Sequence, residues 1–180
     1  MTDTHIKTIN SPEFNLSDED YNYQDELTKE LDSFNGDFDQ NLINKIVLWK
    51  INRYAKVDEE VIQLVNSILP SDKIIDKEKT RKVLTALLKI SGIGIPMAST
   101  ILRFRNPNIY QIIDQRAYRI FVGEQLKLSV TKVEENIKIY LDYLEKMKTF
   151  CIINGTNFAE ADRFLYEKDK RLNKEIKIKY

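Results

Sequence analysis

Apolar residues recur along most of the chain at mixed spacings of three and four, which is the period of an amphipathic helix. This pattern predicts helices over residues 38–54, 58–69, 78–90, 131–149 and 157–173. Only five Gly and four Pro occur, too few for the many tight turns of an all-β protein. We therefore predict an all-α fold of seven or eight helices.

The first 36 residues differ from the rest in charge and in pattern. Residues 1–40 carry two basic and eleven acidic side chains, about −9, so the remainder carries about +9 although the whole chain is neutral. Residues 1–16 show no helical period, whereas residues 17–33 can form a helix capped by Ser17. We interpret residues 1–36 as an acidic, partly disordered arm and residues 37–180 as a helical domain.

This division of charge fits two interpretations. The arm is either a solvated tail beside an ordinary, slightly basic domain, or it shields a surface that binds nucleic acid. Net charge bears on partners and not on the fold, so the choice between the two rests on motifs.

The scarcity of Cys and His limits the chemistry. With Cys151 and His5 as the single examples of each, the chain cannot form a disulfide framework, a four-cysteine iron–sulfur cluster or a Cys/His zinc site. Hydrolysis by a Ser-His-Asp or Cys-His arrangement is nearly excluded, because His5 lies in the predicted arm. No apolar run approaches 18 residues and no signal peptide is recognisable, so we expect a cytoplasmic protein that does not contact membranes.

Residues 84–104 predict two helices joined by a short turn that contains two glycines. Glycine permits positive φ and lets another backbone come close, and the apolar residue between the two can fill the space between the helices. Pro96 suits a first helical turn, where its missing N–H removes no hydrogen bond. Unpaired N–H groups at a helix N-terminus attract anions. We predict that a DNA phosphate binds here at four residues: Gly92, Ile93, Gly94 and Ile95.

Residues 80–122 resemble the helix-hairpin-helix DNA glycosylases of base-excision repair. Twenty residues after the second glycine, an apolar pair precedes Asp114, and Arg119 follows in the next predicted helix. That order is similar to the hairpin, apolar pair, catalytic Asp and basic helix of the family. The resemblance implies two small helical lobes around a cleft, a helix-hairpin-helix motif at residues 80–104, double-stranded DNA as the partner and Asp114 as the catalytic residue.

Two departures from that family narrow the expected activity. Its strand-cleaving members have a lysine two residues after the second glycine, where this chain has Pro96, and the cysteines for the iron–sulfur cluster of some members are missing. The resemblance therefore implies a monofunctional glycosylase that hydrolyses the N-glycosidic bond of a damaged or modified base. No cofactor is expected, apart from a monovalent cation at the hairpin carbonyls.

A carboxylate such as Asp114 has a clear use in this reaction. Breaking the glycosidic bond builds positive charge on the deoxyribose, which a nearby carboxylate stabilises while it orients or deprotonates the attacking water. An Asp that opens a helix is also commonly a simple N-cap, and Asp114 can serve both purposes.

The base has to leave the helical stack before it is hydrolysed, so a pocket with aromatic walls is expected. Candidates for the base pocket are Trp49, Arg53 and Tyr118. Candidates for phosphate contacts, besides the hairpin, are Arg116 and Arg119, with Arg103 and Arg105 close by in the sequence. The simpler interpretation places Trp49 in the core and leaves the charged side chains in solvent.

Three functions stay open at this point. The first is the DNA glycosylase. The second is a helix-hairpin-helix DNA-binding protein without catalytic activity, which the missing lysine and the short chain favour. The third is a helical protein-interaction domain that uses its acidic arm as the contact.

Overall fold

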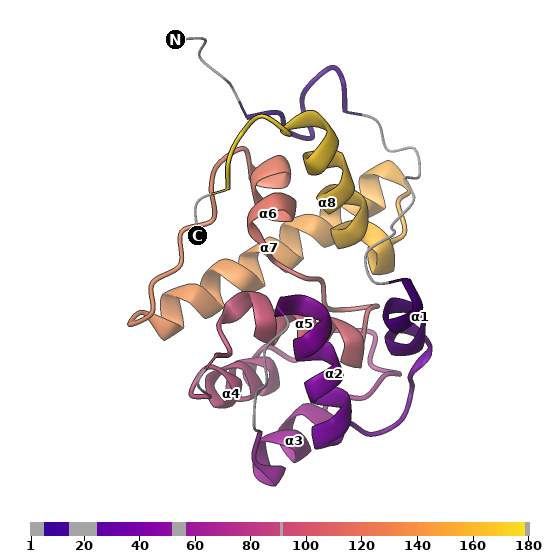
Figure 1. Cartoon of the computed structure of the whole chain (residues 1–180), viewed down its shortest axis with the longest axis vertical. Helices are drawn as coiled ribbons and strands as arrows, with labels where there is room; N and C mark the ends of the chain where they lie inside the picture. The colour runs from indigo at the N-terminus through magenta and orange to yellow at the C-terminus, as the bar shows by residue number, and fades with distance from the viewer. Residues whose placement is uncertain (1–5, 15–24, 52–56, 91, 179–180) are drawn as a thin grey trace.

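The computed structural model describes residues 6–14, 25–51, 57–90 and 92–178. Within these ranges the chain forms eight α-helices, one 3₁₀ turn and no β-strand (Figure 1). The elements are α1 (Asp25–Ser33), α2 (Gln40–Ile51), α3 (Glu59–Asn66), α4 (Lys77–Leu87), α5 (Ile95–Arg105), α6 (Gln115–Val122), α7 (Val133–Asn154), η1 (Phe158–Glu160) and α8 (Ala161–Leu172). The predicted all-α fold of seven or eight helices is confirmed.

Each of the five helices predicted from apolar spacing is present, with shifted ends. The largest shift is in α7, which continues five residues past its predicted end at residue 149. It stops at Gly155, whose left-handed backbone (φ 62°) ends the helix. The predicted cap Ser17 lies outside the described residues, and α1 begins at Asp25.

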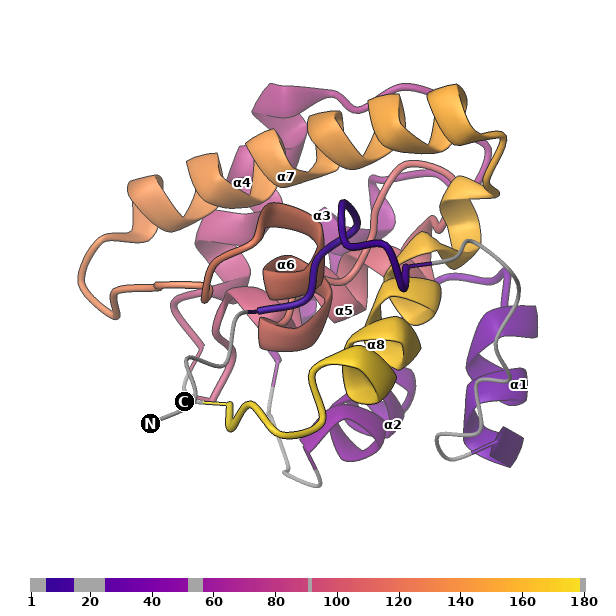
Figure 2. The same cartoon turned by 90° about the horizontal axis from the view of Figure 1, so that it is seen from above.

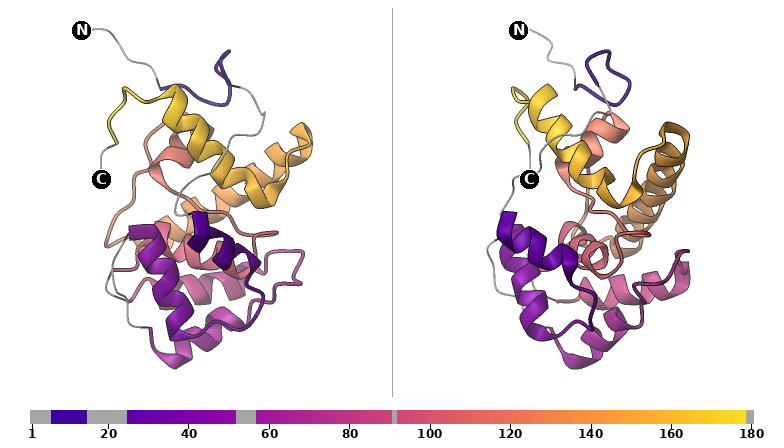
Figure 3. Two further views of the ribbon diagram at one scale, coloured as in Figure 1. Left: turned by 45° about the vertical axis from the view of Figure 1, so that its right-hand side comes forward. Right: turned by 90° about the vertical axis from the view of Figure 1, so that its right-hand side faces the viewer.

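Helix α5 lies at the centre of the fold and contacts α2, α3, α4 and α7 (Figures 1 and 3). Every residue from Met97 to Arg105 is buried. Its second turn carries the small side chains Ala98, Ser99 and Thr100, which allow neighbouring elements to approach closely. The segment after the glycine turn is therefore the most enclosed of the described helices.

Helices α1 to α5 gather in the lower part of Figure 1, and α6 to α8 gather in the upper part. Helices α6 and α8 pack side by side, and α7 reaches back to α4 and α5. One hydrophobic core runs through both groups. The two groups therefore fold as one unit, and the cleft between two lobes stays a prediction.

The described parts of the acidic arm lie against the domain. Residues 6–14 run over α6 and beside α8 (Figure 2). There the backbone N–H of Ile9 donates to the carbonyl of Ile120 at 2.8 Å, and that of Lys7 donates to the Asn173 side chain. Helix α1 packs against α2. Both segments are thus part of the packed structure.

Candidate active site and nucleic-acid interface

The turn between α4 and α5 presents open backbone. Gly92 has φ 86°, a left-handed conformation that favours glycine, and a Cβ added there would meet nothing within 4 Å. A Cβ at Gly94 would meet only Pro96 Cδ, at 3.8 Å. Between the two exposed glycines, Ile93 is buried in the core, as the sequence predicted. The backbone is therefore exposed at Gly92 and Gly94, while Ile93 anchors this part of the turn in the core.

Helix α5 begins at this turn without a side-chain cap. Gly94 is its N-cap, Pro96 occupies its first turn, and no side chain of the described residues caps the first N–H groups. These groups have no carbonyl partner within their own helix. The exposed Lys89 lies three residues before Gly92 in the sequence. The arrangement suits an anion, and DNA phosphate binding by residues 92–95 stays a prediction.

Asp114 is the N-cap of α6. Its Oδ1 accepts hydrogen bonds from the backbone N–H of Arg116 at 2.9 Å and of Ala117 at 2.8 Å. Its side chain is 17% exposed, so the carboxylate reaches solvent. The capping role considered for this residue is confirmed, and Oδ1 is fully occupied by it.

The second oxygen of Asp114 meets a lysine that the sequence did not indicate. Lys50 Nζ, from the last turn of α2 and 64 residues earlier in the chain, lies 3.4 Å from Asp114 Oδ2. It is the one partner of this oxygen among the described residues. The Lys50 side chain is also 17% exposed, and its Nζ lies 6.0 Å from the centroid of the Trp49 ring. Each oxygen of Asp114 therefore has its own environment.

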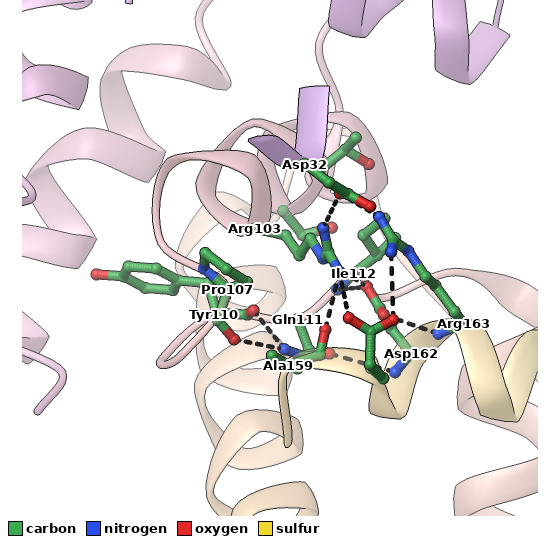
Figure 4. A network of polar contacts seen from close by, with 12 residues as sticks. Asp32, Arg103, Pro107, Tyr110, Gln111, Ile112, Ala159, Asp162 and Arg163 are labelled. Carbon is green, nitrogen blue, oxygen red and sulfur yellow. Dashed lines mark hydrogen bonds and ion pairs between the residues drawn. The ribbon is translucent and has the colours of Figure 1, made fainter. Parts of the chain in front are cut away.

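The chain enters Asp114 through an extended, buried segment whose backbone is held by side chains. The N–H of Ile112 donates to Asp162 Oδ2 at 3.0 Å, and Tyr143 donates its hydroxyl to the Ile112 carbonyl at 3.1 Å. The Gln111 side chain accepts from the N–H of Asp162 at 3.2 Å (Figure 4). Burial holds the pKa of the Tyr143 phenol well above its usual value, so this donor keeps its proton. A buried segment without helix or sheet partners needs such bonds.

Ser99 connects this segment to the glycine turn. Its hydroxyl donates to the carbonyl of Pro96 at 2.8 Å and accepts from the N–H of Ile113 at 3.2 Å. The residue is fully buried. Two hydrogen bonds therefore link the first turn of α5 to the residue that precedes Asp114, which places the glycine turn and the carboxylate relative to one another.

A buried ionic network supports the same region from α1 and α8 (Figure 4). Arg103 on α5 donates to Asp32 Oδ1 at 2.6 Å and to the Ala159 carbonyl at 2.8 Å, and its Nε lies 3.7 Å from Asp162 Oδ2. Its side chain is 3% exposed. Arg103 is thus bound inside the protein and cannot reach a phosphate. The same holds for Arg105, which donates to three backbone carbonyls.

The assignment of Arg119 to phosphate contact is wrong. Its side chain is 1% exposed, and it donates from Nε to Asp169 Oδ1 at 2.6 Å and from its second terminal nitrogen to Oδ2 at 2.8 Å. It turns toward α8 because a buried carboxylate there binds its planar guanidinium with two parallel bonds. Arg116, one turn earlier, is 28% exposed and lies 3.3 Å from Asp169 Oδ2; its phosphate contact stays a prediction.

The three candidates for the base pocket have different outcomes in the structure. Trp49 as a pocket wall is wrong: the ring is buried against Phe104, edge to face at 5.3 Å, and its Nε1–H donates to Thr28 Oγ1 at 2.6 Å. Tyr118 is half-buried beside α7, and its place in a pocket stays a prediction. Arg53 lies outside the described residues.

Comparison of the chain with protein-family models, with curated proteins and with solved structures found no match. Among the helices of the described residues, none combines the length and the apolar surface that a membrane span requires. In the same part of the chain, no three His, Cys, Asp or Glu side chains come together as a metal-ligand group.

Proposed function

We propose that the protein is a DNA glycosylase-like enzyme of base repair. It binds double-stranded DNA through the helix-hairpin-helix turn at residues 92–95, flips out a damaged or modified base and hydrolyses the N-glycosidic bond with Asp114. One observation carries the proposal: Asp114 is anchored through Oδ1, its Oδ2 takes no part in the cap, and the residue before it is tied through Ser99 to the first turn of α5, which begins at the turn that suits a phosphate.

Hydrolysis of the glycosidic bond requires an oriented carboxylate, which Asp114 provides. The two backbone N–H groups fix the orientation of the carboxylate, and Oδ2 can approach C1′ of a flipped nucleotide. There its charge stabilises the oxocarbenium-like transition state, and the attacking water is oriented by the same oxygen. Water is the only co-reactant, and the proposal calls for no cofactor.

We expect the turn at residues 92–95 and exposed lysine side chains to bind the DNA backbone. Arg103, Arg105 and Arg119 are buried, so they add little to the field that a phosphate backbone meets. The exposed Lys89, three residues before Gly92 in the sequence, is the cation that we expect to reinforce the helix N-terminus. We therefore expect binding to weaken with added salt, with a slope set by a few phosphate contacts.

The catalytic part is tested with duplex oligonucleotides that each carry one lesion. After incubation with the protein, alkali cleaves the strand at abasic sites, and the products are resolved on a denaturing gel. Wild type should release at least one base, whereas Asp114→Asn should be slower by about 100-fold or more. Asn still caps α6 with its side-chain oxygen, so this variant should keep the fold. Excision by Asp114→Asn at the wild-type rate would refute the catalytic role.

The hairpin is tested with Gly94→Asp. An Asp at this N-cap can bond the first N–H groups of α5, which keeps or raises stability. It also occupies and repels the place of a phosphate, so affinity for duplex DNA should fall by about tenfold or more. Unchanged affinity in a fluorescence-anisotropy titration would exclude the turn as the phosphate site.

The same titration separates the other two functions. Salt-dependent binding without excision of any lesion identifies a non-catalytic DNA-binding protein. No binding at low salt leaves the protein-interaction domain.

A further inference from the structure

Three helices each send a side chain to the backbone just before Asp114. The carboxylate of Asp162, on α8, accepts from the N–H of Ile112 at 3.0 Å, and the hydroxyl of Tyr143, on α7, donates to the carbonyl of the same residue at 3.1 Å. Ser99, on α5, accepts from the N–H of the following residue at 3.2 Å. All three side chains are buried. The two residues before Asp114 are thus held by α5, α7 and α8 together.

A helix cap alone does not require this arrangement. Asp76 is the N-cap of α4, and its Oδ1 accepts from a backbone N–H at 3.0 Å, as Asp114 Oδ1 does at α6. Two residues before Asp76, Ile74 is 79% exposed, whereas Ile112 is buried. Within the part of the chain that the structure describes, no side chain bonds the backbone of the three residues before Asp76. A cap therefore forms without a fixed approach, and the approach to Asp114 is fixed for another reason.

The choice of partners for Ile112 is also informative. A buried N–H needs an acceptor, but taking a carboxylate such as Asp162 out of water costs free energy that a neutral acceptor avoids. Arg103 balances this charge, since its Nε lies 3.7 Å from Asp162 Oδ2. A hydrogen bond to an ionised acceptor is about twice as strong as a neutral one. Burial, and then the negative charges of Asp162 and Asp114, hold the pKa of the Tyr143 phenol well above its usual value, so this donor keeps its proton.

We propose that Asp162 and Tyr143 are positioning residues for the Asp114 carboxylate. Ile112 lies two residues before Asp114, so a rotation of its backbone moves the carboxylate. The distance from Asp114 Oδ2 to a bound deoxyribose is then set by α7 and α8 as well as by α5. Because a misplacement of about 1 Å can slow a reaction by about 100-fold, the two bonds act on the rate of hydrolysis rather than on DNA binding. The inference rests on the proposed function for the reaction, while the placement of the carboxylate is measured without it.

The test variants each change one bond to Ile112. Tyr143→Phe keeps the ring and loses the hydroxyl that bonds the carbonyl. Asp162→Asn keeps the size of the side chain and removes the charge from the acceptor of the N–H. Tyr110→Phe is the matched control, because it loses a similarly buried hydroxyl whose partner is the Thr80 side chain. Thermal melts check that all three variants are folded.

The first measurement needs no DNA. The backbone N–H groups of Arg116 and Ala117 donate to Asp114 Oδ1, and a hydrogen bond to a carboxylate moves an amide proton downfield. The two amide resonances are followed by NMR in the ¹⁵N-labelled full-length protein at fixed pH. Both should move upfield in Tyr143→Phe and in Asp162→Asn, and both should stay in place in the control. A general loss of stability does not move native-state resonances, so this measurement separates positioning from a purely structural role.

The second measurement is the excision assay at a series of DNA concentrations, with a lesion that wild type releases. In Tyr143→Phe and in Asp162→Asn, kcat should fall by about tenfold or more while KM changes by less than about twofold. Tyr110→Phe should keep both constants at the wild-type values.

The outcomes separate this proposal from the proposed function. Wild-type resonances of Arg116 and Ala117 in both folded variants, equal shifts in the control, or a wild-type kcat in both variants would overturn the positioning role. If wild type releases no lesion, the proposed function fails and the resonances alone decide. Displaced resonances then support the placement of Asp114 through Ile112, and unmoved resonances refute it.

Discussion

Two carboxylates that bond to helix α6, Asp169 on α8 and Asp114 at the N-cap of α6, differ in how many donors surround them. Asp169 is completely buried and receives hydrogen bonds from Arg119, Arg116 and Asn173, so both of its oxygens are occupied. Asp114, at the start of the same helix, is partly exposed, and its Oδ2 meets one lysine amine. The first carboxylate is saturated with donors and fastens α6 to α8. The second has one oxygen that takes no part in the cap and meets a single amine. The number of donors around each charge thus separates the carboxylate that holds the fold from the carboxylate that we propose for chemistry.

The largest loss of stability is expected from removing Asp169, the carboxylate whose two oxygens are both hydrogen-bonded. Asp169→Ala leaves the buried Arg119 without its two carboxylate bonds, and an uncompensated buried charge destabilises a protein by about 3–5 kcal/mol. Urea denaturation should show this loss. The matched variant Asp142→Ala, at an exposed position of α7, should change the unfolding free energy by less than about 0.5 kcal/mol. A loss for Asp169→Ala no greater than that of the control would contradict the assigned role.

A smaller loss of stability is expected from removing the hydrogen bond that holds the segment before Asp114. Ser99→Ala removes the acceptor of the buried Ile113 N–H, and a buried donor without a partner costs about 1–3 kcal/mol. Because the turn itself is untouched, DNA affinity should change little while excision slows, since Asp114 is no longer fixed relative to the hairpin. Stability is measured by denaturation and the two functions by titration and excision assay. Equal losses in binding and excision per folded molecule would argue against a positioning role.

The two oxygens of Asp114 can themselves be compared. Asp114→Ala removes the cap of α6, which costs about 1 kcal/mol, whereas Asp114→Asn keeps a capping oxygen and should leave stability nearly unchanged. Both variants remove the charge at Oδ2 and should be equally poor in excision. If the Ala variant proves as stable as the Asn variant in thermal melts, then Oδ1 contributes no cap.

The mildest perturbation is alkaline pH, which removes protons from buried neutral groups rather than from the two carboxylates. Burial raises the pKa of Tyr110 to about 12 and that of Cys151 to about 11. Both groups stay protonated in the folded protein at pH values where the unfolded chain, with ordinary pKa values of 10 and 9, has lost the protons. Stability should therefore be constant up to about pH 9 and fall from there to about pH 12.

The variant Tyr110→Phe sharpens this measurement. It removes one of the buried groups whose pKa is raised, so the unfolding free energy should decline less steeply between about pH 10 and pH 12, while the contributions of Cys151 and of the other buried tyrosines remain. A profile parallel to wild type over the whole range would show that Tyr110 does not titrate differently in the two states.

The amphipathic helices and the Asp114 cap were predictable because their signals are local. Apolar spacing marks the buried face of a helix such as α7, and an Asp after an apolar pair is a recognisable N-cap. Gly92 and Gly94 likewise marked the turn. Phosphate binding and catalysis at these positions are not tested by the fold.

The sequence could not reveal the pairs that join distant segments. Lys50 and Asp114 are 64 residues apart, and Arg119 and Asp169 are 50 apart. Nothing in the spacing of Arg116 and Arg119 tells which of them turns inward, since that depends on the carboxylate that α8 presents. Trp49 was misplaced in a pocket for the same reason: its burial is decided by Phe104 and Thr28, which belong to other helices.

The two hydrogen bonds of Ser99 bear on which nucleotide the proposed enzyme would act on. The turn and the segment before Asp114 are both fastened to the first two turns of α5, where each residue advances about 1.5 Å along the axis. Under the proposed function, α5 fixes the distance between the turn and Asp114. The phosphate bound at the turn then determines which sugar faces the carboxylate. On that proposal, the protein inspects one nucleotide at a time, at a fixed distance from the bound phosphate, and shifts along the strand to inspect the next.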